Sequence, residues 1–213
     1  MKLAMAGMPL NRSIWLLIAC LMLIFLGSAL ISPRTGYGQL NLNFDDIEID
    51  VLHVQGNVYM LVGAGGNITL QVGEEGVLIV DSMYPELADR VLGIIRELSD
   101  QPIRYLINTH VHPDHIGGNA TFAQAGTNFA AGNVAGLIDD AANTATIIAH
   151  ENVLLRMSSQ ETPPPFEAWP TDTFFNDSKE VYFNGEAVRV LHQPAAHTDG
   201  DSIVFFRRSD VIS

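Results

Sequence analysis

The sequence gathers metal-binding side chains in one short stretch, Thr109–Gly118, which reads Thr-His-Val-His-Pro-Asp-His-Ile-Gly-Gly. It holds three imidazoles and a carboxylate, the groups that bind zinc at about 2.0–2.2 Å. Without a metal, so many polar side chains would make a poor surface loop and a costly core segment. We therefore expect a catalytic metal site, in which three protein ligands leave one position open for water.

A strand directly before this stretch would place it at the edge of a sheet. Alternating β-branched and aromatic residues predict a buried strand over 103–108, and sites collect at the carboxyl ends of strands in open α/β sheets. In an extended loop His110 and His112 face the same side, because side chains two positions apart share a face. Asp114 and His115 follow a proline that bends the chain, so they can face a second metal position nearby.

The pattern His-x-His-x-Asp-His with Gly-Gly, after an apolar strand, resembles the signature of the metallo-β-lactamase superfamily of zinc hydrolases. Gly76–Ser82 resembles that family's apolar strand ending in an aspartate, and Ala196–Asp201 resembles its Gly-His-Thr-x-Gly segment. The similarity spans roughly residues 51–213. It implies an α/β fold of the αββα type, in which two sheets are sandwiched between helices.

The resemblance also implies the roles of individual residues. His110, His112 and His197 would hold a first zinc ion, and Asp114 and His115 would contribute to a second, so a complete domain would carry one or two Zn²⁺. A water on zinc has its pKa lowered to about 7, which supplies a zinc-bound hydroxide at neutral pH. Asp114 would orient that hydroxide and accept its proton as the catalytic base.

Other polar residues are expected to play supporting or structural parts. Asp81 would lie behind the ligands and fix an imidazole or the loop by hydrogen bonding, and a strand-end cap is the alternative. His53 and His150 have no ligand-type neighbours at useful spacing, which favours structural roles. His192 stands five residues before His197 in a strand-like run, so we expect it to be packed or hydrogen-bonded.

The resemblance further predicts ligands beyond the end of this sequence. The family's site is completed by an aspartate or cysteine after the next strand and by a later histidine, both C-terminal to the His-Thr segment. The sequence ends at Asp210–Ser213, which is expected to open that strand. The expectation is a metallo-β-lactamase-like domain over 39–213 that lacks its C-terminal strands and helices and binds zinc weakly.

Residues 1–38 are predicted to be a signal peptide or an N-terminal membrane anchor. An uncharged apolar run over 14–31 follows Lys2 and Arg12 and leads to small residues at 36 and 38, the layout of a secretory signal cleaved after Gly38. The run is also just long enough to span a bilayer. Cys20 lies within it in a segment like a lipoprotein box. A secreted or periplasmic location is expected, with membrane contact only through this segment.

The excess of acidic residues and the single cysteine limit the classes of substrate and ligand that we expect. The chain has 11 Lys and Arg against 24 Asp and Glu, and Lys2, Arg12 and Arg34 precede the expected cleavage point, which leaves 8 basic residues. A nucleic-acid substrate needs a basic track that releases counterions, so we expect a small-molecule substrate and no nucleic acid. Cys20 is the single cysteine, which excludes disulfides and thiolate ligands from the sequence that follows it.

Hydrophobic periodicity predicts alternating strands and helices. Strands are expected over 51–61, 68–72, 77–80, 181–183, 187–191 and 202–207, with a turn at 63–67, and helices from 85 to 98, over 116–124 and over most of 132–158. The segment 159–176 is rich in proline and aromatic residues. It is expected to form either a wall of the substrate pocket or a cover over the core.

Three classes of function remain open at this point. The first is an exported zinc hydrolase of an amide, ester or thioester, with a β-lactam ring as one candidate and a glyoxalase II-like thioesterase as another. The second is an iron-dependent redox member of the superfamily, although three histidine ligands favour zinc. The third is an inactive or weakly metal-binding remnant.

Overall fold

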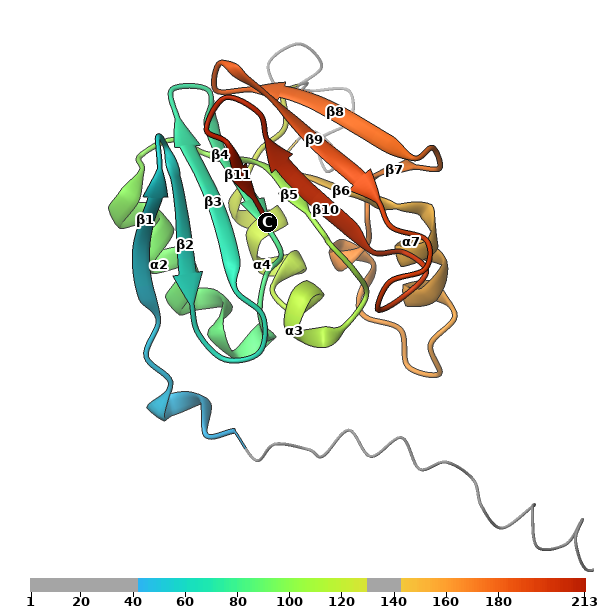
Figure 1. Cartoon of the computed structure of the whole chain (residues 1–213). Helices are drawn as coiled ribbons and strands as arrows, with labels where there is room; N and C mark the ends of the chain where they lie inside the picture. Colours follow the sequence, from blue (N-terminus) through green and yellow to red (C-terminus); the bar gives the residue numbers. More distant parts are fainter. Residues whose placement is uncertain (1–41, 130–142) are drawn as a thin grey trace, which may run out of the picture. The chain divides into compact units, whose positions relative to one another are not determined.

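The computed structural model describes residues 42–129 and 143–213, and within them one sheet has seven strands in the order β1-β2-β3-β4-β5-β6-β7 (Figure 1). Strands β1 to β4 are antiparallel, and β4 to β7 run parallel. The bounds are β1 Asp50–Gln55, β2 Val58–Val62, β3 Ile68–Gly73, β4 Gly76–Val80, β5 Ile103–Ile107, β6 Thr146–His150 and β7 Asp172–Phe174.

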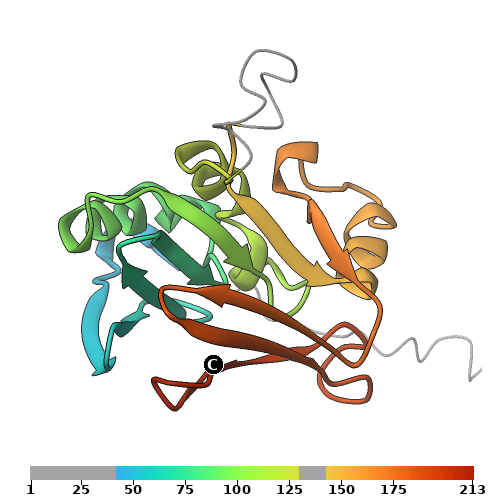
Figure 2. The same cartoon turned by 90° about the horizontal axis from the view of Figure 1, so that it is seen from above.

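A second, antiparallel sheet faces the first one (Figure 2). Its strands in the described residues are β8 Ser178–Phe183, β9 Glu186–His192, β10 Ser202–Phe206 and β11 Val211–Ile212, in the order β11-β10-β9-β8. Buried apolar side chains from both sheets fill the space between them: Val58, Leu78, Val80, Ile107, Ile148 and Phe174 from the first, and Val181, Phe183, Val188, Val190, Val204 and Phe206 from the second.

Helices cover the other face of the first sheet. They include α2 Ala88–Leu98, α4 Asn119–Ala125 and α7 Glu151–Ser158, with the single turn α3 Pro113–Ile116 beside them. The apolar stripe of α2 is buried against this sheet, as its three- and four-residue spacing predicts. The described residues thus form layers of helix, sheet and sheet. None of their helices crosses a membrane, because each is too short or too polar.

Strand β4 shows how the layers determine the sequence pattern. All five of its residues are buried, because the strand lies inside the sheet with cores on both faces. Val77 and Ile79 pack toward the helices, whereas Leu78 and Val80 pack toward the second sheet, in keeping with the two-residue period of a strand. This strand ends directly before Asp81.

A buried carboxylate joins the two sheets. Glu186 Oε1 accepts hydrogen bonds from Gln71 Nε2 of β3 at 2.7 Å and from Ser209 Oγ at 2.8 Å. Its Oε2 accepts the backbone N–H groups of Arg208 and Ser209 at 2.8 and 3.0 Å. Burial raises the pKa of Glu186, but these hydrogen bonds outweigh it and hold the pKa below its ordinary value.

Two predicted elements are wrong. The segment 51–61 is a hairpin rather than one strand, because the chain turns at Gly56, whose φ of 59° is readily adopted by glycine. In the described part of 132–158, the predicted helix covers only α7 Glu151–Ser158, because residues 146–150 form the strand β6. Strand β7 was not predicted, and the helix expected over 116–124 is divided into α3 and α4.

The other predicted elements are confirmed: the strands near 68–72, 77–80, 103–108, 181–183, 187–191 and 202–207, and the helix ending at Leu98. The predicted signal peptide or anchor over 1–38 lies outside the described residues. The same holds for the start of the predicted helix over 132–158, up to residue 142.

Candidate metal centre

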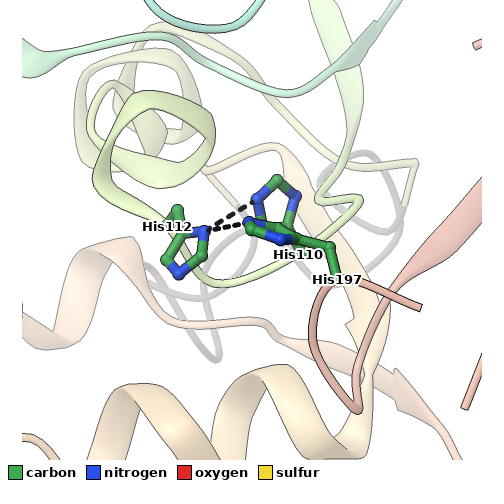
Figure 3. Close-up of side chains that lie close together, drawn as sticks. All are labelled: His110, His112 and His197. Carbon is green, nitrogen blue, oxygen red and sulfur yellow. Dashed lines mark hydrogen bonds between the residues drawn. The ribbon is translucent and has the colours of Figure 1, made fainter. Parts of the chain in front are cut away.

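Three histidines from two sheets converge on one point (Figure 3). His110 and His112 follow β5 of the first sheet, and His197 lies in the loop between β9 and β10 of the second. His112 Nδ1 lies 3.1 Å from His110 Nε2 and 3.0 Å from His197 Nε2. These residues form a cluster that is able to hold a metal ion.

The spacing of these rings fits zinc, and so do the lowered pKa values of His110 and His112. Two nitrogens bound at about 2.0–2.1 Å to a tetrahedral zinc lie roughly 3.3 Å apart, close to the distances between these rings. Burial, followed by the neighbouring His115, lowers the pKa of His110 to about 4. Burial and His197 likewise lower the pKa of His112. Both rings are therefore neutral at neutral pH and have a lone pair for a metal.

A chain of hydrogen bonds from Asp81 sets the tautomer of His110. Asp81 accepts the Thr109 N–H and the Thr109 hydroxyl, each at 2.7 Å. The Thr109 hydroxyl uses its hydrogen in the bond to Asp81. In its contact of 3.1 Å with His110 Nδ1 it can therefore only accept, so the ring nitrogen must donate. His110 then carries its proton on Nδ1, and its Nε2 lone pair faces the cluster.

The position of Asp81 depends on an unusual backbone conformation. Its φ is 63°, in the left-handed region that aspartate tolerates better than most residues. This turn at the end of β4 lets the Asp81 N–H donate to Ile107 O at 2.8 Å while its carboxylate reaches Thr109 and His115. The carboxylate thus supports two neighbouring histidines.

Asp114 and His115 lie beside the three-histidine cluster rather than within it. The rings of His110 and His115 have centroids 4.0 Å apart. His115 Nδ1 is 2.6 Å from Asp81 Oδ2, and His115 Nε2 is 3.6 Å from Asp114 Oδ2. Burial lowers the pKa of His115, but the hydrogen bond and charge of Asp81 outweigh it, so the net shift is upward.

Glycines let the turn at 63–67 approach this second group closely. A Cβ on Gly66 would lie 2.8 Å from His115 Cε1, and one on Gly65 would lie 2.6 Å from the Cβ of Asp114. Close packing also explains a glycine in the Gly-Gly pair after the histidines, because a Cβ on Gly118 would lie 2.5 Å from the backbone oxygen of Ser82. These contacts place α3 against both neighbouring loops.

A cavity of about 610 Å³ opens beside the histidines. His110, His115 and His197 line one part of it, and Met60, Ile203 and Ile212 add apolar wall. No residue of the segment 159–176 lines this cavity. Within that segment Phe174 packs in the core between the sheets, and Trp169 packs near α7, so part of it serves as a cover.

The remaining histidines of the described chain make other contacts. His53 Nε2 bonds to Gly56 O at 2.9 Å. His150 and His192 stack with ring centroids 3.5 Å apart, and His192 Nε2 lies 2.9 Å from Asp199 O. The structural roles expected for these three residues agree with these contacts.

Two residues at the site had no role in the sequence-based prediction. The Thr109 hydroxyl bonds to both the Asp81 carboxylate and His110 Nδ1. The Asp201 carboxylate accepts the backbone N–H groups of His197 and Thr198. A threonine directly before the first histidine was a usable signal, because its hydroxyl can reach an adjacent ring. Asp201 offered a weaker signal, because two of its three donors are backbone amides and only the Thr198 hydroxyl depends on residue type.

A family model described as the metallo-β-lactamase superfamily matches residues 61–213, which include every residue of this centre. The chain belongs to the metallo-β-lactamase superfamily. The predicted αββα fold class is confirmed by this match and by structural likeness. A metallo-β-lactamase, MIM-1 from Novosphingobium pentaromativorans, superposes with a TM-score of 0.57 at 21% identity, over 76% of this chain and 58% of that one.

Two curated proteins match this chain over shorter stretches. A linear primary-alkylsulfatase of Pseudomonas sp. is 43% identical over 49 residues, which cover 22% of this chain and 9% of that protein. A coenzyme F420H₂ oxidase of Methanothermobacter marburgensis is 36% identical over 63 residues, which cover 28% of this chain and 16% of that protein. The chain therefore spans only a small part of these relatives.

Proposed function

We propose that the chain is a zinc-dependent hydrolase of an ester, thioester or amide, with a β-lactam among the candidate substrates. The observation that carries this proposal is the convergence of three ring nitrogens on one point, with His112 Nδ1 3.1 and 3.0 Å from the other two. Three imidazoles beside an open cavity fit a catalytic zinc site, which leaves one position free for water.

Bound zinc would polarise a substrate carbonyl and lower the pKa of a water to about 7. His110, His112 and His197 would hold the first ion, and Asp114 and His115 would contribute to a second. Thr109 and Asp81 keep the Nε2 lone pair of His110 directed at the cluster.

Asp114 is the residue proposed to accept a proton. Its carboxylate lies next to His115, with 3.6 Å between Asp114 Oδ2 and His115 Nε2. It can orient an attacking water through a hydrogen bond and take the proton that the water gives up. The apolar wall of Met60, Ile203 and Ile212 would receive the hydrocarbon part of a small substrate.

An iron-dependent redox activity is the second candidate, and the match to the coenzyme F420H₂ oxidase favours it. Imidazole ligands suit zinc as well as iron, so the ligand types do not decide alone. We place zinc first because the described cluster consists of three histidines and contains no carboxylate.

Export remains part of the proposal, based on the apolar run over 14–31. Acidic residues outnumber basic ones, which argues against a nucleic-acid substrate. A small-molecule substrate is therefore proposed. Fractionation of cells that produce the full chain would test the location, and appearance in the cytoplasm without processing would contradict export.

Metal analysis combined with substrate assays tests the function. We expect purified chain to hold zinc in preference to iron, and to hydrolyse a chromogenic ester, a thioester or nitrocefin only with metal present. Iron together with turnover of a reduced flavin-type donor would favour the redox candidate. A chain without affinity for either metal would contradict both activities and favour a remnant.

A further inference from the structure

His197 is exposed and lies on a loop, so side-chain packing does little to hold it in place. Its Nε2 nevertheless lies 3.0 Å from His112 Nδ1, a residue 85 positions away in the sequence (Figure 3). A metal ligand must be held close to its productive geometry if binding is not to cost ordering entropy. Some other contact must therefore order the loop.

The Asp201 carboxylate provides that contact. Its Oδ2 accepts the backbone N–H of His197 at 2.5 Å, and its Oδ1 accepts the backbone N–H of Thr198 at 2.9 Å as well as the Thr198 hydroxyl. Hydrogen bonds to an ionised carboxylate are stronger than those between neutral groups. They hold the peptide units on both sides of the His197–Thr198 junction.

Backbone hydrogen bonds join the segment at Asp201 to the end of β9 and to the loop that carries His110 and His112. Asp201 O accepts the Gln193 N–H at 2.7 Å, and the Ser202 N–H donates to Thr109 O at 2.9 Å. Thr109 directly precedes His110 and is itself held by Asp81. Asp201 thus belongs to a continuous series of hydrogen bonds that sets the distance between the two loops.

We infer that Asp201 is a positioning residue that presents His197 to the metal, an inference that rests on the proposed function. Its oxygens are used by three donors from residues 197 and 198, so it acts through His197 and does not itself bind the ion. The described metal-holding cluster likewise consists of the three histidines without Asp201.

The test compares Asp201→Asn and Asp201→Ala with Asp199→Asn. The asparagine variant keeps the shape of the side chain but replaces one accepting oxygen with a donor. Asp199 is the matched control, because it lies in the same loop and its carboxylate pairs with Arg156 on the surface. Zinc affinity is measured by competition with a chelator, and cobalt(II) is used for its ligand-sensitive absorption spectrum.

We expect both Asp201 variants to lose about 10- to 100-fold in affinity for each metal, the usual effect of removing a residue behind a ligand. The cobalt(II) spectrum should change as well, and Asp199→Asn should stay within about twofold of the unchanged chain. Unchanged affinity and spectrum in a folded Asp201→Asn variant would overturn the inference. So would an equal loss in Asp199→Asn, because it would indicate general loosening of the loop.

A metal-free measurement separates this inference from the proposed function. Hydrogen exchange in the chelated protein should show protected amides at His197 and Thr198, and both Asp201 variants should lose that protection. Protected amides in a chain that binds neither metal would contradict the hydrolase and leave the positioning intact. Unprotected amides in the unchanged chain would overturn the positioning role even if zinc binds.

Discussion

At the scale of single residues, His112 is the central member of the three-histidine cluster, because its Nδ1 lies within 3.1 Å of both other ring nitrogens. Replacement by alanine should remove zinc binding more severely than the roughly 10- to 100-fold loss caused by removing a residue behind a ligand. Isothermal titration of zinc into the purified variant would measure this loss.

His53→Ala is the control for that experiment. His53 lies on the exposed edge strand β1 and bonds to Gly56 O, and it does not belong to the three-histidine cluster. Its zinc affinity should match that of the unchanged chain. Equal losses in the two variants would contradict the assignment of the metal to the cluster.

The sequence indicated the three clustered histidines better than the residues that position them. The two-residue spacing of His110 and His112 predicts that they share a side, because that follows from local backbone geometry. The contributions of Thr109 and Asp201 depend on which groups lie nearby in space. Two of the three donors to Asp201 are backbone amides, which every residue type except proline offers, and only the Thr198 hydroxyl depends on residue type.

At the scale of elements, the turn at 63–67 is coupled to α3 through its glycines. Gly66→Ala should destabilise the chain by about 1–3 kcal/mol, the usual cost of overpacking, because the new Cβ would lie 2.8 Å from His115 Cε1. Urea unfolding would measure the change in free energy.

Gly93→Ala is the matched substitution. A Cβ there would meet nothing within 4 Å, and Gly93 lies inside α2, where alanine is favoured over glycine by roughly 0.5–1 kcal/mol. This variant should therefore be more stable than the unchanged chain. A Gly66→Ala chain at least as stable as the unchanged chain would argue against close packing at Gly66.

Glu186 makes the contact between the sheets sensitive to acid. Because its pKa is lowered in the folded chain, its stabilising effect is full above the unfolded pKa of about 4.3 and is lost as the pH falls through the folded value. Glu186→Gln should lower the free energy of unfolding at pH 7 by about 1–3 kcal/mol. It should also flatten the dependence of that free energy on pH in the acid range.

Glu180→Gln serves as the comparison for Glu186. Glu180 meets Arg189 and Arg207 only at 3.7 and 3.9 Å near the surface, and such pairs contribute about 0–1 kcal/mol. Unfolding by urea at several pH values would compare the two variants. An equally steep acid dependence in Glu186→Gln would show that another group is responsible.

Prediction of the elements succeeded for α2, β4 and β5 and failed for β6 and β7. The apolar stripe of α2 identified a helix, and β4 and β5 were recognised by their β-branched residues. Strand β6 is buried on both faces, and an apolar run of that kind cannot be distinguished from a buried helix by periodicity. Its identity as a strand depends on pairing with β5 and β7, which are distant in the sequence.

At the scale of the whole molecule, a metal at the cluster would draw its ligands from both sheets. Zinc should therefore stabilise the folded chain, by about 2.7 kcal/mol when its free concentration is 100 times the dissociation constant. For a chain of this size that amounts to roughly 5–10 °C in Tm. Differential scanning calorimetry with zinc and with a chelator would measure the shift, and an unchanged Tm would contradict binding to the folded state.

The separation of His112 and His197 along the chain has a topological consequence. They lie 85 positions apart, so a metal that binds both would close the intervening backbone into a ring. One peptide bond cut inside that ring would leave the two pieces tethered at the ion as well as through the apolar layer between the sheets. A nicked chain should then keep its two fragments together in zinc and release them more readily once the ion is chelated.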